Sequence, residues 1–204
     1  MRLQVDPLPH LWWLASRASG VVALVLVTIS VGIGLAMSAK LMRDKRLGPK
    51  LMAIHEQTAL AGLIAIGVHG VTLLGDPWLK PSVAGISIPF VMDYRTLFTG
   101  FGIVAGWLAL LLGMSFYFRR QIGAARWRRM HKATVFVYVL GLAHTIGAGS
   151  DAATPWLSWF MIVTAVPITA LFVKRVVGAR RAPASLDRRD RVVLGGPVPR
   201  SRGV

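Results

Sequence analysis

Five apolar segments, each close to the length that crosses a bilayer, dominate this sequence. The hydrocarbon core of a bilayer takes about 20 apolar residues of helix, and the segments cover residues 18–37, 51–74, 96–118, 133–148 and 156–173. The fourth is the shortest, and it reaches spanning length only if His131 and Lys132 join it. Charged residues make up 16% of the chain, against roughly a quarter in a soluble domain. The sequence therefore predicts an all-α integral membrane protein, a bundle of five transmembrane helices.

Positive charge accumulates between these segments. Lys and Arg number 24 against 8 acidic residues. Nucleic-acid binding is one interpretation of such a charge, but here long apolar runs interrupt the basic residues and leave no basic helix face. The basic residues follow the first, third and fifth spans, whereas residues 76–95 hold two basic and two acidic residues and residues 149–155 hold only Asp151. The positive-inside rule then predicts a multi-pass protein of the cell membrane with its N-terminus outside and its C-terminus in the cytoplasm.

The ends of the spans and of the chain agree with this topology. No basic segment precedes a short apolar stretch, so we expect no cleavable signal peptide. From Gly178 onward the chain is rich in Arg, Pro, Gly and Ser, and we expect a disordered cytoplasmic tail. The chain thus divides into a transmembrane domain, residues 1–173, and a basic tail, residues 174–204. Five tryptophans fall near the outer interface, as an aromatic belt would place them: Trp12, Trp13, Trp78, Trp156 and Trp159.

Cysteine is absent from the chain. Its absence excludes disulfides, cysteine-ligated iron–sulfur clusters, zinc ribbons and thioether-attached haem. Any metal or redox chemistry must therefore use other ligands.

Four of the five histidines lie in or at the edge of the second and fourth spans. His55 and His69 stand fourteen positions apart in the second span, and His131 and His144 stand thirteen apart in the fourth. One span separates these two, so they run parallel, and His55 lies level with His131 while His69 lies level with His144. At a rise of 1.5 Å per residue, the two levels are about 20 Å apart.

Level-matched histidine pairs indicate a function. Ionisable side chains are expensive inside a membrane, and although one buried histidine can be a satisfied polar contact, two matched pairs are much harder to explain in that way. Neutral imidazole is a natural axial ligand of haem iron, and two imidazoles fill both axial positions. Two haems stacked across a bilayer would conduct electrons through it. We therefore predict a membrane cytochrome b.

A histidine-lined metal or proton transporter is the alternative from another class. Zinc and di-iron sites usually recruit carboxylates as well. Glu56, beside His55, is the only acidic residue inside a predicted span. The scarcity of carboxylates makes a transporter less favoured but does not exclude it. A membrane anchor without a cofactor is the simplest alternative.

The spacing in the fourth span conflicts with a regular helix. Fourteen residues return a side chain to within about 40° of the same face, whereas thirteen leave it about 140° away. We therefore expect the fourth helix to be distorted, supercoiled or offset, and Gly141 offers flexibility near His144.

Several motifs resemble the ferric-reductase-like transmembrane domain family, which includes ferric reductases, NADPH oxidases and the haem subunit of a bacterial methionine sulfoxide reductase system. The resemblance covers residues 13–155, and the doubled histidine spacing is its most specific element. The other motifs are Arg17-Ala18-Ser19-Gly20, Trp127-Arg128-Arg129-Met130-His131, and His144 followed by Gly147-Ala148-Gly149-Ser150-Asp151.

The resemblance implies two b-type haems, an inner one held by His55 and His131 and an outer one held by His69 and His144. Large family members append a FAD and NAD(P)H module, but residues 174–204 contain no G-x-G-x-x-G motif and leave no room for a Rossmann unit. A sixth, N-terminal helix of many relatives is also not expected in residues 1–11. We therefore expect the haem subunit of an oxidoreductase that receives electrons from a separate flavoprotein or a membrane quinol. A ferric chelate, oxygen, a flavin or an outward-facing partner protein remain open as acceptors.

Four cations near the predicted haem levels each have two interpretations. Arg17, at the outer edge of the first span, and Arg95, just before the third, are interface anchors or partners of an outer haem propionate or quinol oxygen. Arg129 and Lys132 flank the inner ligand His131. They either satisfy the positive-inside rule or pair with a propionate of the inner haem.

Overall fold

The computed structural model describes residues 10–39, 41 and 46–181. This part of the chain is all-helical, and no strand occurs within it. Its helices are α1 (Leu11–Ser38), α2 (Leu47–Leu73), α3 (Val83–Ser87), α4 (Thr96–Met114), α5 (Arg119–Ile122), α6 (Ala124–His131), α7 (Thr134–Ala148) and α8 (Pro155–Arg181).

Four of the described helices, α1, α2, α4 and α8, are long and apolar enough to cross a membrane. Their outward faces carry large apolar side chains: Ile64, Leu111 and Val166 are 60%, 65% and 67% exposed. Apolar surface on this scale is costly in water, whereas hydrocarbon accepts it, so the surface suits a lipid bilayer. The 15 residues of α7 cover about 22 Å, less than the roughly 30 Å hydrocarbon core.

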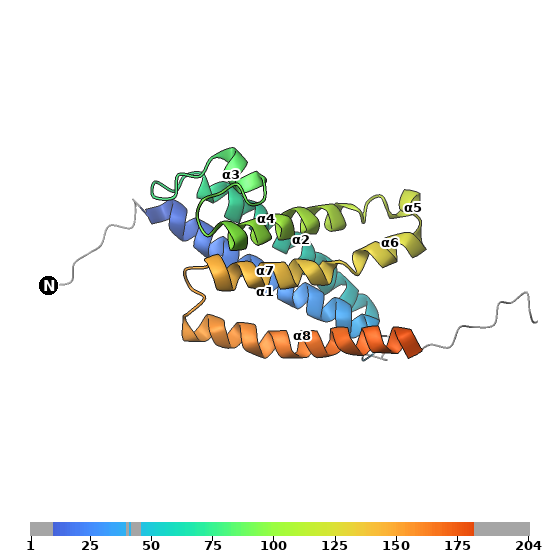
Figure 1. Cartoon of the computed structure of the whole chain (residues 1–204). Helices are drawn as coiled ribbons and strands as arrows, with labels where there is room; N and C mark the ends of the chain where they lie inside the picture. The colour runs from blue at the N-terminus through green and yellow to red at the C-terminus, as the bar shows by residue number, and fades with distance from the viewer. Residues whose placement is uncertain (1–9, 40, 42–45, 182–204) are drawn as a thin grey trace, which may run out of the picture.

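The long helices form two antiparallel pairs with α8 alongside (Figure 1). The segments α1 and α2 make one pair and α4 and α7 the other, while α8 packs against α1. The start of α1, the end of α2 and α3 lie at one end of the bundle, and α5 and α6 lie at the other. We call these the His69 end and the His55 end.

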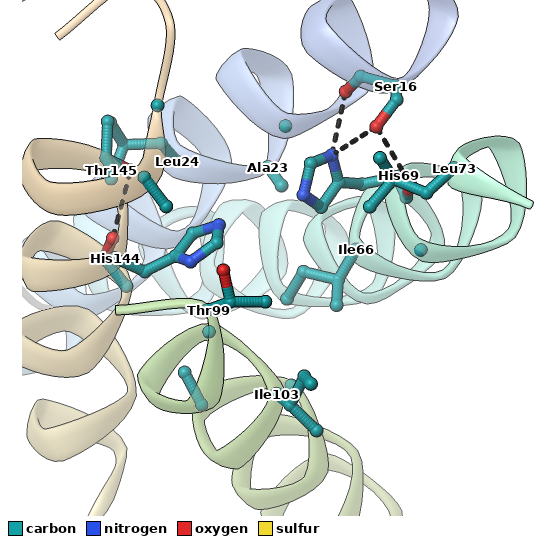
Figure 2. A pocket seen from close by; sticks show the side chains of 18 of the residues that line it. Ser16, Ala23, Leu24, Ile66, His69, Leu73, Thr99, Ile103, His144 and Thr145 are labelled. Carbon is teal, nitrogen blue, oxygen red and sulfur yellow. Dashed lines mark hydrogen bonds between the residues drawn. The ribbon is translucent and has the colours of Figure 1, made fainter. Parts of the chain in front are cut away.

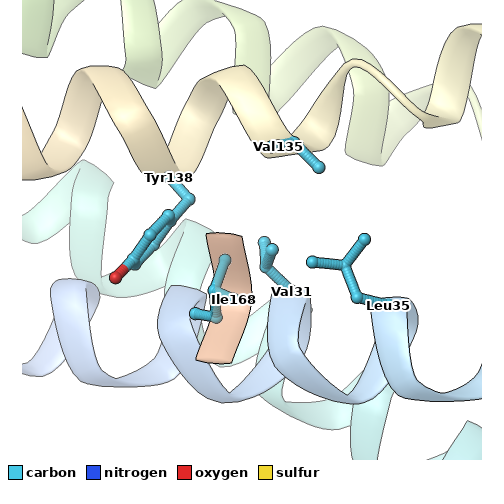
Figure 3. Close-up of a cluster of buried hydrophobic side chains, with 5 residues drawn as sticks. All are labelled: Val31, Leu35, Val135, Tyr138 and Ile168. Carbon is cyan, nitrogen blue, oxygen red and sulfur yellow. The ribbon is translucent and has the colours of Figure 1, made fainter. Parts of the chain in front are cut away.

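Apolar side chains from α1, α7 and α8 form the core of the bundle. Val31, Leu35, Val135, Tyr138 and Ile168 make one cluster (Figure 3). A second cluster, Leu24, Leu157 and Met161, holds the start of α8 against α1. Because lipid tails are as apolar as leucine, close packing rather than removal from water stabilises such contacts in a bilayer.

The helices begin and end at somewhat different residues from the predicted spans. The dipeptide Gly48-Pro49 is typical of a turn and predicts one after the first span, but this prediction is wrong, because α2 begins at Leu47. Pro49 lies in the first turn of α2. Backbone N–H groups there have no acceptor within the helix, so the N–H that proline lacks costs no hydrogen bond. At the other end of the third span, α4 ends at Met114 and not at Phe118. The four residues that follow bond back to the third or fourth residue before them and form turns.

The last helix extends beyond the predicted fifth span. α8 continues past Val173 to Arg181, so residues 174–181 of the predicted tail are helical. Residues 182–204 lie outside the described residues, and the tail expected there stays a prediction.

The basic connection after α4 folds into two short helices, α5 and α6, at the His55 end. Its sequence holds no acidic residue between positions 115 and 132. Five of its basic residues are exposed: Arg120, Arg126, Arg128, Arg129 and Lys132.

A turn at Lys132 and Ala133 separates α6 from α7, between the two histidines of this segment. The amides of Ala133 and Phe136 each bond the carbonyl three residues earlier, at 2.9 Å. Each residue of such a 3₁₀ turn rotates by about 120° instead of about 100°. This extra rotation turns His144 toward the face of His131 and reduces the mismatch of the thirteen-residue spacing. The expected distortion therefore exists, but it lies at Lys132–Ala133 and not at Gly141, which is inside α7.

Candidate functional site

The four histidines meet in two facing pairs. The ring centroids of His55 and His131 are 6.0 Å apart, with their planes at 86°. The rings of His69 and His144 are 6.1 Å apart, with their planes at 72°. Helix α2 supplies one ring to each pair, while α6 and α7 supply the others. The structure thus brings together the histidines that the sequence places at the same depth.

Backbone carbonyls hold three of the four rings through Nδ1. The Nδ1 of His69 lies 2.8 Å from the carbonyl oxygen of Ser16, and that of His55 lies 2.9 Å from the carbonyl of Ser30. The Nδ1 of His144 lies 2.9 Å from the carbonyl of Phe98. A carbonyl can only accept, so each Nδ1 carries the proton, and a neutral ring then has its lone pair on Nε2. Metal-ligating histidines are held and oriented in this way.

Helix α1 places one serine beside each histidine of α2. Ser16 and Ser30 stand fourteen positions apart, as do His55 and His69, and antiparallel packing places Ser30 beside His55 and Ser16 beside His69. Each hydroxyl donates to the carbonyl of its histidine, at 3.1 Å from Ser16 and 3.3 Å from Ser30. These serines were not predicted as site residues, although their spacing of fourteen positions, which equals that of His55 and His69, could have indicated them.

Two glycines of α1 follow the same repeat and leave room for the rings. Gly20 and Gly34 have the same spacing as the two serines. A Cβ at Gly20 would lie 2.9 Å from Nδ1 of His69, and one at Gly34 would lie 3.3 Å from Cε1 of His55. Gly20 belongs to the motif quoted for the family resemblance, and its contact with His69 gives that motif a physical reason.

The fourth histidine, His131, is held differently. Its Nδ1 is buried and has no hydrogen-bond partner within the part of the chain that the structure describes. The indole of Trp127 stacks on it, with centroids 4.9 Å apart and planes at 24°. Arg175, on α8, lies close enough to His131 to interact with it electrostatically, although it was predicted only as part of the tail.

A cavity of about 560 Å³ is lined by His69 and His144. Figure 2 shows the two rings facing each other across it, with apolar side chains of α1, α2 and α4 around them. Its volume lies in the range of small-molecule and cofactor sites. Apolar lining residues include Leu24, Ile66 and Ile103.

The arginines predicted near the outer level have protein partners. The guanidinium of Arg17 pairs with both carboxylate oxygens of the buried Asp151 and lies 4.8 Å from the ring centroid of Trp13. This ion pair joins α1 to the connection between α7 and α8 at the edge of the cavity. Asp151 ends the motif that follows His144, and nothing in that motif indicates its pairing with Arg17.

The other three predicted cations lie at both ends of the bundle. Arg95 donates from Nη1 to the carbonyl of Gly147, at 2.5 Å, and lies 5.7 Å from the ring centroid of Tyr94. Arg129 and Lys132 are exposed on either side of His131 at the His55 end.

The donor set fits a bis-axial haem better than a bare metal ion. No group of three or more His, Asp or Glu side chains that could hold a metal ion gathers among residues 10–39, 41 and 46–181. Structural zinc takes four protein ligands and catalytic zinc three, whereas a haem needs only axial ligands from the protein. Two metal–nitrogen bonds of about 2 Å each, with the half-widths of two imidazoles, come to roughly 6 Å between ring centres. Both pairs have this separation.

No protein-family model matches this chain, and no solved structure matches it. The paired histidines, their hydrogen-bond acceptors and the cavity between two of them are therefore the grounds for a functional assignment.

Proposed function

We propose that this chain is a transmembrane cytochrome b, an electron-transfer subunit of the ferric-reductase-like kind. His55 and His131 would be the axial ligands of an inner haem b, and His69 and His144 those of an outer one. The observation that carries the proposal is the pair of facing imidazole couples, with ring centroids 6.0 Å and 6.1 Å apart. When bound, haem supplies a one-electron iron couple.

The surrounding residues have definite tasks in this proposal. The carbonyls of Ser16, Ser30 and Phe98 keep the proton on Nδ1 and leave the Nε2 lone pair for iron. The cavity beside His69 and His144 is lined mainly by apolar side chains, which favours a neutral ligand and a cofactor with an apolar face. Helix α2 sets the distance between the two levels at about 20 Å.

The proposal includes a topology for the cell membrane. The segment α6–α7 makes the fifth crossing, with α6 at the interface, so that the His55 end faces the cytoplasm and the His69 end faces outward. The basic residues on α5 and α6 support this orientation. The start of α1 and the end of α8 lie at opposite ends of the bundle, as an odd number of crossings requires (Figure 1).

Electrons would enter and leave through partners. A separate flavoprotein at the basic His55 end or a membrane quinol is the proposed donor. An outward-facing protein or a ferric chelate is the proposed acceptor at the His69 end. The exposed arginines of α6 beside His131 support a donor at the His55 end, since clustered positive charge steers an acidic partner.

The test is the haem content and absorption spectrum of the purified full chain. A reduced-minus-oxidised spectrum should show sharp b-type bands from two haems. His69→Leu and His144→Leu should each remove the same outer haem, and His55→Leu and His131→Leu should each remove the inner one. His10→Leu is the matched control, because His10 is exposed and precedes α1.

Two outcomes would overturn the cytochrome assignment. Wild-type protein could bind no haem, or all four variants could keep two low-spin haems. A histidine-lined metal or proton transporter would then be the better hypothesis, and uptake by proteoliposomes would test it.

A further inference from the structure

His131 is the exception among the four histidines. The other three donate from Nδ1 to a backbone carbonyl, whereas the Nδ1 of His131 is buried and has no such acceptor within the described residues. No hydrogen bond from Nδ1 therefore sets the orientation of this ring about its χ2 torsion. Something else must hold it if it is to face His55.

Trp127 is placed to do this. It lies four residues before His131 on α6, so the two side chains share one face of the helix. Their rings are stacked, with centroids 4.9 Å apart and planes at 24°. The imidazole of His131 also meets the ring of His55 edge-on, with an interplanar angle of 86°. The indole therefore fixes the plane of the His131 ring beside the ring of His55.

Trp127 is itself anchored by the segment that follows α4. Its Nε1 donates to Oγ of Ser115, at 3.1 Å, and Ser115 is buried and donates to the carbonyl of Leu112, at 2.6 Å. Phe116 packs edge-to-face against the indole, with centroids 6.0 Å apart. A chain of contacts thus runs from the end of α4 through Trp127 to His131.

The position of His131 in α6 explains why such support is needed. His131 is the last residue of α6, and the turn at Lys132 and Ala133 follows it. Helix ends fray more readily than helix interiors. The other rings lie within α2 and α7, where the helix itself limits their movement.

We propose that Trp127 is the positioning residue of His131, and that Ser115 fixes Trp127 for this task. The inference rests on the proposed function, because it concerns an inner haem that His131 would ligate. A ligand whose Nδ1–H lacks an acceptor is less basic than one that donates to a carbonyl. The inner haem therefore has one strongly donating ligand, His55, and one weaker one, whereas the outer haem has two strong ones.

Removing the indole has a definite expected effect. In Trp127→Ala the ring of His131 can rotate, and water reaches its Nδ1 and accepts the hydrogen bond. The ligand becomes more basic and the site more exposed, and both changes stabilise the ferric state. We expect the midpoint potential of the inner haem to fall, its low-spin electron paramagnetic resonance signal to broaden, and part of the inner haem to be lost.

The experiment compares Trp127→Ala, Trp127→Phe, Ser115→Ala and the control Trp156→Ala in the full chain. Trp156 is 55% exposed near the start of α8, at the His69 end. Potentiometric titration and low-temperature spectra are recorded for both haems. Trp127→Phe keeps a stacking ring and should rescue most of the effect, while Ser115→Ala should give a smaller shift in the same direction as Trp127→Ala. The outer haem should be unchanged in all four, and Trp156→Ala should resemble wild type.

An inner haem with unchanged potential and spectrum in Trp127→Ala would overturn the inference. If that variant fails to fold, Ser115→Ala decides, and the absence of any inner-haem shift in Ser115→Ala would overturn the inference. Failure of the proposed function is a different result, because it appears as wild-type protein that binds no haem.

Discussion

Gly102 on α4 lies against the imidazole of His144 on α7, so closely that a Cβ at this position would come within 2.5 Å of Nδ1. The same Nδ1 donates to the carbonyl of Phe98, one turn earlier on α4. Helix α4 therefore positions His144 in two ways: the carbonyl of Phe98 accepts its hydrogen bond, and Gly102 leaves space for its ring. Any larger residue at position 102 must displace the ring that faces His69.

The first prediction follows from this contact. Gly102→Ala should push His144 away from His69, break its bond to Phe98 and destabilise the fold by about 1–3 kcal/mol through overpacking. If the chain binds the two proposed haems, the outer one should be lost or become high-spin while the inner one is retained. Gly106→Ala is the control, one turn further along α4, where a Cβ would make only an ordinary 3.5 Å contact with Ile66. Haem content and thermal unfolding in detergent measure both effects, and a Gly102→Ala variant with an intact outer haem would contradict this account.

The second prediction concerns the ion pair of Arg17 and Asp151. Asp151→Ala removes a buried carboxylate that binds two guanidinium nitrogens, and hydrogen bonds to charged groups are each worth about 1.5–3 kcal/mol. Solvent reaches Arg17, whose side chain is 38% exposed, and compensates for part of the loss. We therefore expect a net destabilisation no larger than one such bond, about 1.5–3 kcal/mol, seen as a lower unfolding temperature. Asp93→Asn is the control because Asp93 is exposed at the same end; equal stability of both variants would show that the pair contributes little.

The third prediction tests the charge beside His131, the proposed ligand of the inner haem. Arg129→Ala removes a cation close to His131 in sequence. Loss of a nearby positive charge disfavours the added electron, so the midpoint potential of the inner haem should fall. The proposed outer haem, about 20 Å from the inner one, would serve as the internal control. An unchanged or raised inner potential in a variant that still binds haem would leave Arg129 as a topology residue only.

The fourth prediction tests the orientation of the bundle. The chain has no cysteine, so a single introduced thiol reports one position. Arg126→Cys, on α6, should be protected from an impermeant maleimide in intact cells and react after lysis, whereas Trp156→Cys, at the start of α8, should react from outside. The opposite labelling pattern would show that the bundle has the opposite orientation in the membrane.

Helix positions could be predicted from the sequence because they depend on local composition. Long apolar runs around Val31 and Ile103 cannot remain unpaired in lipid unless their backbones form helices, and α1, α2, α4 and α8 lie where those runs are. The error at Gly48-Pro49 is also local in origin. A proline is compatible with a turn and with the first turn of a helix, and the sequence alone does not distinguish them.

The depth of each histidine was likewise set by the sequence, because helical rise converts residue spacing into distance. That His55 meets His131 and His69 meets His144 depends on how α2 packs relative to α6 and α7, and it was expected only once parallel spans were assumed. Rotation about the helix axis was harder to predict, because it depends on a few 3₁₀ hydrogen bonds at Lys132 and Ala133. Such backbone hydrogen bonds cannot be detected in the pattern of apolar residues along the sequence.

Only the tertiary structure decided which groups surround the rings. The carbonyl of Phe98 reaches His144 from a different helix, Asp151 binds Arg17 from a distant part of the sequence, and Ser115 supports Trp127 from beyond the end of α4. Backbone carbonyls carry no residue-specific signal, and contacts between distant segments depend on the relative shift and rotation of whole helices. The sequence by itself determined an apolar helical bundle with histidines at two depths. Packing determined which nitrogen of each histidine carries the proton, how its ring is oriented and how much space surrounds the ring.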